Sequence, residues 1–303
     1  MRIVFLGSPA DAVPPLKALV AAGHEVALVV TRPDRRRGRG EGESPSPVKR
    51  AAIELGLPVV TPDRSRDALA DLAASGATLG VVVAYGQILR PDFLAALPEG
   101  FVNLHFSLLP RWRGAAPVER AILAGDEETG VCLMRVEEGL DTGGVYASAR
   151  LTIDADETAW ELRARLVELA TGLLVQHLPA VPGAVPEPQV GEATYADKLT
   201  VEEFAIDATR TATHLHRLVR AGNPRPGAWC TVGGRRVKVW KARPSDALVP
   251  EGASPGTLTK NGALVVGDGV LELLEVQPEG KRSMSGAALV AGLARDARRL
   301  DPR

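Results

Sequence analysis

The sequence predicts an α/β protein with a doubly wound, mostly parallel sheet, followed by a small C-terminal β-barrel domain. Over the first 150 residues, short apolar runs alternate with helical patterns, as they do in strand–helix–strand units. The runs IVFL, ALVV and VVVA are apolar on both faces, as buried strands of a parallel sheet must be. Beyond residue 203, short strand-like runs separated by turn residues replace this alternation, which is typical of a small OB-like barrel.

Each element of the α/β region carries its own signal. A helix is expected to end at Gly23, because glycine commonly follows the last helical turn. A second helix should begin after Ser46 as N-cap, with Pro47 at its first position and Gly56 closing it. The expected strands are residues 2–7, 25–31, 57–61, 78–86 and 100–106, and the expected helices are residues 11–23, 46–56, the segment from about 65, and 157–178.

Composition sets the domain boundaries. Residues 180–193 are rich in Pro and Gly and show no periodicity, which is typical of a linker. We therefore predict a Rossmann-like catalytic domain over 1–180, a linker over 181–203 and a β-barrel domain over 204–303. In the last domain, a helix near 209–221 should precede strands at 228–232, 235–242, 256–260, 262–267 and 270–278.

Charge is distributed unevenly along the chain. Residues 204–303 contain 16 Lys and Arg against 9 Asp and Glu, a charge of +7, which leaves −8 for residues 1–203. A basic C-terminal third favours a polyanionic partner such as nucleic acid, although solvated surfaces often show the same imbalance. No apolar run is long enough for a membrane span, and the start of the chain does not resemble a leader. We therefore expect a cytoplasmic protein without a membrane partner. We also expect a monomer.

Two common classes of site are disfavoured. Cys132 and Cys230 each lie in an apolar run, which argues against disulfides and against a cysteine-based zinc site, and we expect no metal. The first strand is followed by GSPAD rather than G-x-G-x-x-G, and no phosphate-binding G-x-x-x-x-G-K-[ST] motif is present. The fold is compatible with dinucleotide binding, but the glycines that this chemistry needs are missing.

Asn103 and His105 are the first candidate catalytic residues. They lie near the end of the predicted strand 100–106 and share one face of it, because side chains alternate along a strand. Open α/β sheets bind ligands at the carboxyl ends of their strands. A single histidine at such a place is more often structural, but two polar side chains on one face of an apolar strand favour a site.

Asp141 is the third candidate, in the turn GLDTGG after the next apolar run. A turn aspartate is usually a local cap, but one that reached the imidazole would orient the ring and favour its charged form. Asn, His and Asp together can orient a carbonyl, stabilise an oxyanion and relay a proton. No nearby Ser or Cys has the setting of an activated nucleophile, so direct acyl transfer to an amine is expected.

The combination of NLH (103–105), SLLP (107–110) and GLDTG (139–143) resembles the formyltetrahydrofolate-dependent formyltransferase family, and the similarity covers nearly the whole chain. The resemblance implies that Asn103, His105 and Asp141 are the catalytic residues. It further implies that 10-formyltetrahydrofolate is the formyl donor and that its folate contacts Ser107, Leu108, Leu109 and Pro110. Phe106 departs from the small residue common at its position, so this turn is expected to be shaped differently.

Further segments are similar to the members of this family that formylate the α-amino group of initiator methionyl-tRNA for translation initiation. These segments are RWRGAAP (111–117), the basic loop TRPDRRRGRG (31–40), YADKL (195–199), NP (223–224), VKVW (237–240) and QPEGK (277–281). Within the loop, Arg39 matches an arginine that contacts the tRNA acceptor stem, and we assign Arg35, Arg36, Arg37 and Arg39 to tRNA binding. Such a run cannot bury itself, but it can become ordered on a phosphate backbone.

Several alternatives stay open at this point. The substrate could be an amino sugar nucleotide or a purine precursor, neither of which needs the arginine-rich loop or a basic β domain. The same three catalytic residues would serve a formyltetrahydrofolate deformylase, and a non-catalytic tRNA- or folate-binding module would keep binding without turnover. The cluster Arg111-Trp112-Arg113 could contact nucleic acid or could fix the loop before the helix at Pro117.

Overall fold

The computed structural model describes residues 1–36 and 43–302, without the side chains of residues 35, 36 and 43. Two compact units divide the chain. Unit 1 comprises Met1–Pro117, Glu128–Thr152 and Arg163–Ala196, and unit 2 comprises Val118–Glu127, Ile153–Leu162 and Asp197–Arg303. Unit 2 thus includes two short segments from within the first 180 residues, which the sequence pattern does not separate from the α/β region.

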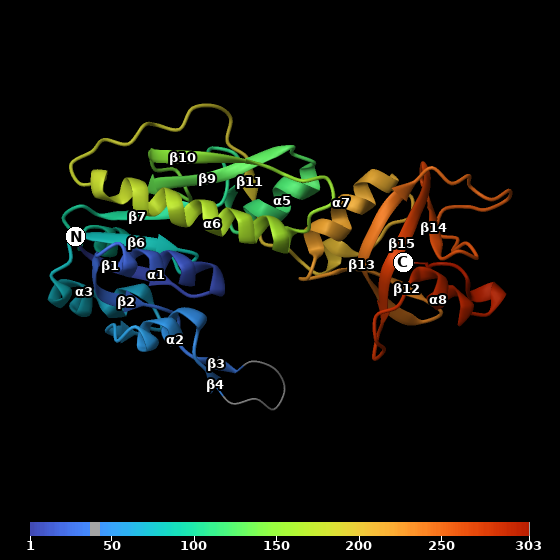
Figure 1. Ribbon diagram of the computed structural model, residues 1–303, viewed down its shortest axis with the longest axis horizontal. Coiled ribbons are helices and arrows are strands. Elements are labelled where there is room, and N and C mark those ends of the chain that lie inside the picture. Colours follow the sequence, from blue (N-terminus) through green and yellow to red (C-terminus); the bar gives the residue numbers. More distant parts are fainter. Residues whose placement is uncertain (37–42, 303) are drawn as a thin grey trace. The chain divides into compact units, whose positions relative to one another are not determined.

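A seven-stranded sheet forms the centre of unit 1, in the order β10-β9-β7-β6-β1-β2-β5 (Figure 1). The strands β7, β6, β1, β2 and β5 are parallel, whereas β9 and β10 are antiparallel to their neighbours. This confirms the predicted doubly wound, mostly parallel sheet. The strands are β1 (Arg2–Gly7), β2 (Glu25–Val30), β5 (Val59–Val60), β6 (Leu79–Val83), β7 (Phe101–His105), β9 (Glu128–Arg135) and β10 (Val145–Thr152).

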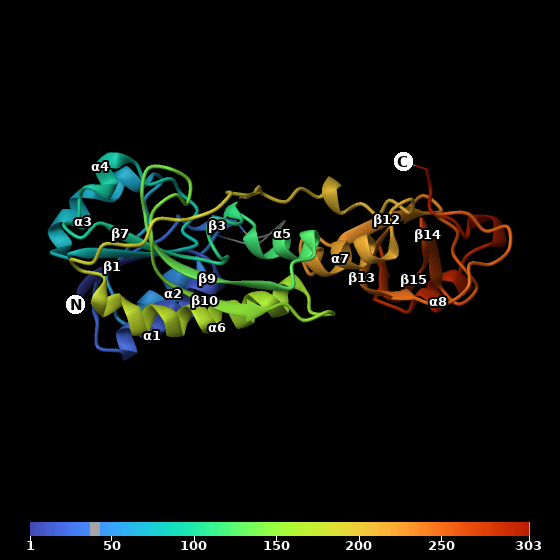
Figure 2. The same ribbon diagram turned by 90° about the horizontal axis from the view of Figure 1, so that it is seen from above.

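Helices cover both faces of this sheet. Seen from above, α1 and α6 lie on one side, and α3 and α4 lie on the other (Figure 2). The helices of the first 180 residues are α1 (Val13–Ala21), α2 (Pro47–Glu54), α3 (Leu69–Ser75), α4 (Pro91–Leu94), α5 (Pro117–Ala124) and α6 (Ala159–His177), and 3-10 turns occupy Ala10–Ala12, Ser65–Ala68 and Leu178–Ala180. All of α5 but Pro117, and the start of α6, belong to unit 2. Among the residues described, no helix combines the length and the apolar character needed to cross a membrane.

The start of α2 forms as its sequence predicts. Ser46 is extended, and its hydroxyl accepts a hydrogen bond from the Lys49 N–H at 3.0 Å, while Pro47 occupies the first turn. Such a cap satisfies one of the N–H groups that a helix leaves unpaired at its start. The cap also fixes the backbone that follows the arginine-rich loop, whose stem is the short pair β3 (Arg35–Arg36) and β4 (Glu43–Ser44).

The core of unit 1 positions β7 tightly. The rings of Phe93 and Phe101 pack with their centroids 5.3 Å apart, and both are buried. Gly80 in β6 is required beside them, because a Cβ there would lie 2.1 Å from the Phe101 ring. A larger residue at position 80 would therefore displace the strand that carries Asn103 and His105.

Unit 2 contains a four-stranded antiparallel sheet in the order β12-β13-β15-β14. β12 and β14 are its outermost strands, and isolated bridges join Leu264 to Leu258, Thr257 to Arg299 and Leu300 to Val232. The predicted β domain is therefore a half-barrel sheet that bridged segments continue from β14 towards β12. Residues 256–260, predicted as a strand, form isolated bridges instead. The helix α8 (Gly286–Ala291) was not predicted. The elements are α7 (Ala212–Gly222), β12 (Ala228–Val232), β13 (Arg235–Ser245), β14 (Ala263–Val266), β15 (Gly269–Pro278), α8 (Gly286–Ala291) and 3-10 turns at Glu202–Phe204 and Arg295–Ala297.

A histidine of α7 is expected to lower the stability of unit 2 in acid. The pKa of His216 is lowered from 6.5, first by burial and then by Arg220, and these effects outweigh Asp156, whose Oδ1 lies 3.3 Å from Nε2. The unfolded chain therefore takes up this proton at a higher pH than the folded chain. The stability contribution is complete above the ordinary pKa of 6.5 and is lost as the pH falls below it.

We expect the urea midpoint to be lower at about pH 5.5 than at about pH 7.5, and the decrease to be smaller in His216→Gln. His177→Gln, which removes an imidazole from the end of α6, is the matched control. Equal decreases in wild type and in His216→Gln would contradict the prediction.

Candidate active site

Asn103 lies in the middle of the sheet, on β7. Its backbone is opposite Val82 of β6 and Met134 of β9, and its side chain is half-buried. Within the described residues, its carboxamide forms no hydrogen bond. An amide held on a central strand with free N–H donors is well suited to receive a carbonyl oxygen.

His105 ends β7 and is held by the segment that follows it. The ring is 5% exposed, and Nε2 lies 2.9 Å from the carbonyl oxygen of Trp112. A carbonyl can only accept, so Nε2 carries a proton and donates it. Trp112 adopts a left-handed backbone with φ +61°, which is uncommon for a residue of its size. The ring is therefore oriented by backbone geometry that the sequence pattern did not reveal.

Asp141 reaches this histidine from a loop. Its Oδ2 lies 3.5 Å from His105 Nδ1 and accepts a hydrogen bond from the Gly114 N–H at 2.8 Å. The sheet register pairs Arg135, at the end of β9, with Val102, so the loop from 136 to 144 must fold back to reach His105. Asp141 has φ +50°, in the left-handed region that short polar residues tolerate best. The structure thus brings Asp141 next to His105, the first requirement of the predicted site.

Gln189, in the predicted linker, is a site residue that the sequence analysis missed. Its Nε2 donates to the carbonyl oxygens of Asp141 and Gly143, both at 2.8 Å. Its Oε1 accepts from Arg113 Nε at 3.1 Å and from Arg113 Nη2 at 2.7 Å. One side chain therefore fixes the loop of Asp141 to the segment that holds His105. A lone glutamine among prolines and glycines gave no signal of this role.

We expect Gln189→Glu to lower kcat by roughly 10- to 100-fold, because a small misplacement of a catalytic group has effects of this size. The carboxylate still accepts from Arg113 but cannot donate to the carbonyls of Asp141 and Gly143. Val190→Ala, at a neighbouring residue that is 86% exposed, should leave kcat unchanged. Steady-state formylation kinetics check this, and a normal kcat for both Gln189→Glu and Gln189→Ala would contradict it.

The SLLP turn (residues 107–110) comes directly after β7 and Phe106 in the chain. Ser107 is fully buried, and its hydroxyl donates to the Arg111 carbonyl at 2.5 Å, so it supports the turn from inside. The peptide bond between Leu109 and Pro110 is cis, and the Leu109 N–H donates to Cys132 Sγ at 3.4 Å. Leu108, Leu109 and Pro110 are half-buried, so they are the residues of this predicted set that offer surface for a folate.

The cluster Arg111-Trp112-Arg113 is now explained in part. The Arg111 guanidinium lies 4.5 Å from the centroid of the Trp112 ring, and the Trp112 N–H donates to Thr194 Oγ1 at 2.9 Å. Residues 113–114 form strand β8 (Arg113–Gly114), which pairs in parallel with β11 (Tyr195–Ala196). These contacts favour the structural role that the sequence left open.

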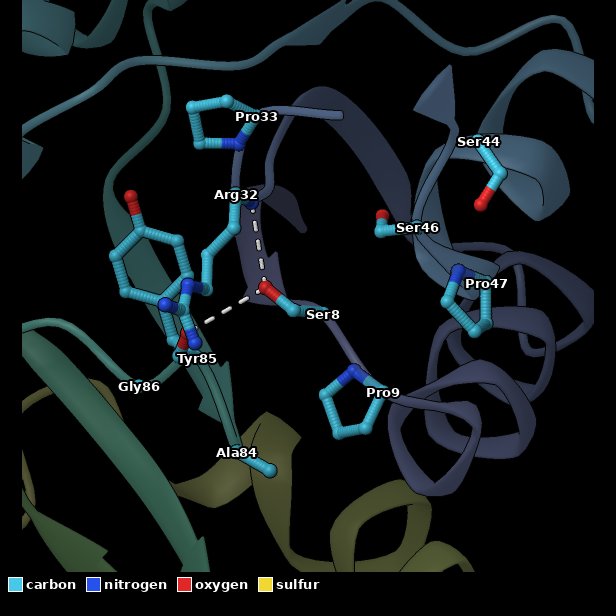
Figure 3. A pocket seen from close by; sticks show the side chains of 10 residues that line it. All are labelled: Ser8, Pro9, Arg32, Pro33, Ser44, Ser46, Pro47, Ala84, Tyr85 and Gly86. Atoms are coloured by element: carbon cyan, nitrogen blue, oxygen red, sulfur yellow. Dashed lines mark hydrogen bonds between the residues drawn. The ribbon is translucent and has the colours of Figure 1, made fainter. Parts of the chain in front are cut away.

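A separate pocket of about 450 Å³ lies where β1, β2 and β6 end (Figure 3). The residues that line it are Ser8, Pro9, Arg32, Pro33, Ser44, Ser46, Pro47, Ala84, Tyr85 and Gly86. The predicted tRNA-binding arginines are close to it in sequence. Arg35 and Arg36 form β3, whereas Arg37 and Arg39 lie outside the described residues.

One face of the sheet in unit 2 combines tryptophans with basic side chains. The Arg236 guanidinium lies 3.8 Å from the Trp229 ring centroid, and Lys238 Nζ lies 4.8 Å from that of Trp240. Trp229 and Lys238 are directly opposite each other on β12 and β13. Cations ordered on aromatic rings are suited to bind a phosphate backbone.

No group of His, Cys, Asp and Glu that could hold a metal ion occurs in the described chain.

Known proteins similar to this chain are formyl transferases. A family model described as formyl transferase matches residues 1–178, and one described as formyl transferase, C-terminal domain, matches 198–294. Methionyl-tRNA formyltransferase of Paracoccus denitrificans is 48% identical over 97% of this chain and 98% of its own. That of Dinoroseobacter shibae is 46% identical over 98% and 99%.

Among solved structures, HypX from Aquifex aeolicus in complex with tetrahydrofolic acid is similar with a TM-score of 0.66 and 19% identity. The match covers 96% of this chain and 47% of HypX, so the chain spans about half the length of that protein. At this identity the likeness concerns the fold.

Proposed function

The chain belongs to the formyl transferase family, and from this premise we propose that it transfers the formyl group of 10-formyltetrahydrofolate to the α-amino group of initiator methionyl-tRNA. The relatives that match both units along nearly their full length are methionyl-tRNA formyltransferases. The observation that carries the proposal is the placement of Asp141 beside His105 at the end of β7, the strand that also carries Asn103 and leads into the turn 107–110.

In the proposed reaction, the neutral amine attacks the formyl carbon, and the carbonyl oxygen becomes an oxyanion. Asn103 donates to that oxygen from its unengaged amide. His105 Nε2–H is already donated to Trp112, so a contribution from this ring to the oxyanion needs a proton on Nδ1, the atom that faces Asp141. The bond between the formyl carbon and N10 of the folate then breaks, and the folate nitrogen receives a proton.

Asp141 is the residue placed to move the amine proton, directly or through a water molecule. Its Oδ2 is held by Gly114 and faces His105, so the carboxylate is fixed before the substrates arrive. A covalent route through the nearby Cys132 is disfavoured, because burial raises the pKa of this thiol and keeps it protonated. These contacts support the direct transfer predicted from the sequence.

The tRNA half of the proposal is supported by two basic regions. The arginine-rich loop contains Arg35, Arg36, Arg37 and Arg39, and unit 2 presents Arg236 and Lys238 on tryptophan rings. Because aminoacylated tRNA is used in translation, we place the activity in the cytoplasm, and we retain the expectation of a monomer acting without a membrane partner. An amino sugar nucleotide or a purine precursor is too small a substrate to need either basic region for binding.

One assay tests the proposal directly. Radiolabelled formyl transfer from 10-formyltetrahydrofolate to methionyl-tRNA should occur, with uncharged tRNA and free methionine as controls that stay unlabelled. Label on neither tRNA nor methionine, with release of formate instead, would indicate a deformylase. Tight binding of both substrates without any turnover would indicate a binding module.

A further inference from the structure

The segment 111–114 contacts two of the predicted catalytic residues through its backbone. The carbonyl of Trp112 accepts the proton of His105 Nε2 at 2.9 Å. Two residues later, the N–H of Gly114 donates to Asp141 Oδ2 at 2.8 Å. Neither bond uses a side chain of the segment. The positions of the imidazole and of the carboxylate therefore depend on how this short stretch of backbone is held.

The backbone of Trp112 is in a conformation that needs support. Its φ of +61° lies in the left-handed region, where the Cβ of a large side chain crowds the neighbouring carbonyl. An extended or right-handed backbone is the usual choice for such a residue. Either change would swing the carbonyl of Trp112 away from His105, so other contacts must hold it in place.

Thr194, in the predicted linker, supplies these contacts. Its Oγ1 accepts from the Trp112 N–H at 2.9 Å, and its carbonyl oxygen accepts from the Arg113 N–H at 2.9 Å. The Arg113 N–H belongs to the same planar peptide group as the Trp112 carbonyl and points the opposite way. This peptide group is therefore held between Thr194 on one side and His105 on the other. Because Thr194 Oγ1 also holds the peptide group before Trp112, it fixes both backbone angles of that residue.

The neighbouring pair of residues holds the N–H that serves Asp141. The carbonyl oxygen of Ala196 accepts from the N–H groups of Ala115 at 2.8 Å and Ala116 at 3.1 Å. Gly114 lies against the same carbonyl with φ +123°, and a Cβ there would be 2.8 Å from that oxygen. Only glycine allows this close approach. Strand β11 thus fixes the backbone on which both His105 and Asp141 depend.

We propose that Thr194 is a positioning residue of the formyl transfer, which acts by setting the direction of the Trp112 carbonyl. This carbonyl keeps one proton of His105 on Nε2, so a further proton can enter the ring only at Nδ1. Asp141 Oδ2 lies 3.5 Å from Nδ1, and the exchangeable proton is therefore confined to the side of the ring that faces the carboxylate. The effect on catalysis rests on the proposed function, whereas the effect on the imidazole does not.

Substitution of Thr194 tests its role kinetically. Thr194→Val removes the acceptor of the Trp112 N–H and keeps the shape of the side chain. It should lower kcat roughly 10- to 100-fold, because a small misplacement of a catalytic group has effects of this size. The KM for methionyl-tRNA and for 10-formyltetrahydrofolate should change little. Thr194→Ser keeps the hydroxyl and should restore most of the lost kcat.

Thr200→Val is the matched control. It removes a nearby threonine hydroxyl that accepts from the Glu203 N–H at 3.4 Å, and it should leave kcat unchanged.

The proton on His105 can be observed without substrates. In protein labelled with ¹⁵N at histidine, two-bond proton–nitrogen correlations show which ring nitrogen is protonated. The sequence contains five histidines, so the signals of His105 are assigned by their loss in His105→Gln. We expect a protonated Nε2 in wild type, in Thr194→Ser and in Thr200→Val. Thr194→Val should lose part of this signal to the form that is protonated on Nδ1.

Substitutions at position 112 separate the role of the backbone from that of the indole. Asparagine tolerates a left-handed backbone, whereas valine resists it. Trp112→Asn should therefore keep a kcat at least about tenfold above that of Trp112→Val, an effect typical of a misplaced catalytic group. Both variants lose the same indole, so the loss of its contacts does not by itself separate them. An equal kcat in both, with an equal rise in the KM for methionyl-tRNA, would make the indole a tRNA contact and overturn the proposal.

Other results would also contradict the positioning role of Thr194. A normal kcat in Thr194→Val with the His105 spectrum of wild type would do so, as would equal losses of kcat in Thr194→Val and Thr194→Ser. If Thr194→Val does not fold, the comparison of the two variants at position 112 still decides. Failure of the proposed function looks different, because wild type would then form no formylated methionyl-tRNA while the spectra of His105 would still differ.

Discussion

Asn103→Ala is expected to lower kcat by at least about 100-fold, the usual effect of removing one donor to an oxyanion. The amide lies on a central strand and forms no hydrogen bond with any described residue, so the loss should appear in the chemical step. The KM for both substrates and the thermal unfolding midpoint should change little. Steady-state formylation kinetics and calorimetry measure the three quantities.

Asp141→Ala should have an effect of similar size, since the carboxylate accepts from Gly114 and faces His105 Nδ1. Asp141→Asn separates the two roles of the side chain, because the amide oxygen can still accept from Gly114 but the carboxylate charge is lost. Glu138→Ala, at an exposed carboxylate in the same loop, is the matched control. A near-normal kcat in Asn103→Ala or Asp141→Ala would remove the residue concerned from the proposed mechanism.

Replacing Arg35, Arg36, Arg37 and Arg39 together by glutamine should raise the KM for methionyl-tRNA by more than about tenfold at low salt. Each lost phosphate contact should also lower the slope of log Kd against log salt by roughly 0.7 to 0.9. The folate KM and kcat at saturating tRNA should be unaffected. Filter binding over a range of salt concentrations and formylation kinetics provide the measurements.

The control for this variant removes the same number of charges elsewhere in unit 1. It replaces the exposed residues Lys17, Arg64, Arg66 and Arg90 by glutamine. If both variants lose affinity equally, the effect is one of net charge, and the loop has no special role. If the loop variant keeps the wild-type salt slope, the four arginines do not contact phosphates.

The strands and helices of unit 1 could be predicted because their signals are local. Two-sided apolar runs give buried parallel strands, and Ser46 with Pro47 gives the start of α2. The segment 256–260 forms isolated bridges rather than the expected strand. Leu258 bridges the nearby Leu264, whereas Thr257 bridges Arg299, which is too distant along the chain for the local pattern to reveal. The short helix α8 was missed, although its Ser285 cap accepts from the Ala288 N–H as a helix start should.

The sequence by itself determined the identity of the chemical groups. The period of two along β7 places Asn103 and His105 on one face, and the resemblance to the formyltransferase family adds Asp141 and the SLLP turn to the predicted site. Single residues such as Thr194 and Gln189 carry no such period and no motif. Their importance depends on what lies beside them in space.

Only the tertiary structure decided how these groups meet. The loop of Asp141 begins beside the start of β7 and folds back to reach His105 at its end. Gln189, 48 positions along the chain from Asp141, holds the loop there. Trp112 orients the imidazole of His105 through its backbone carbonyl. Because every residue type has this group, the side chain at position 112 could not reveal the role. The pocket of Arg32 likewise exists because three parallel strands end together, a relation that chain order alone does not contain.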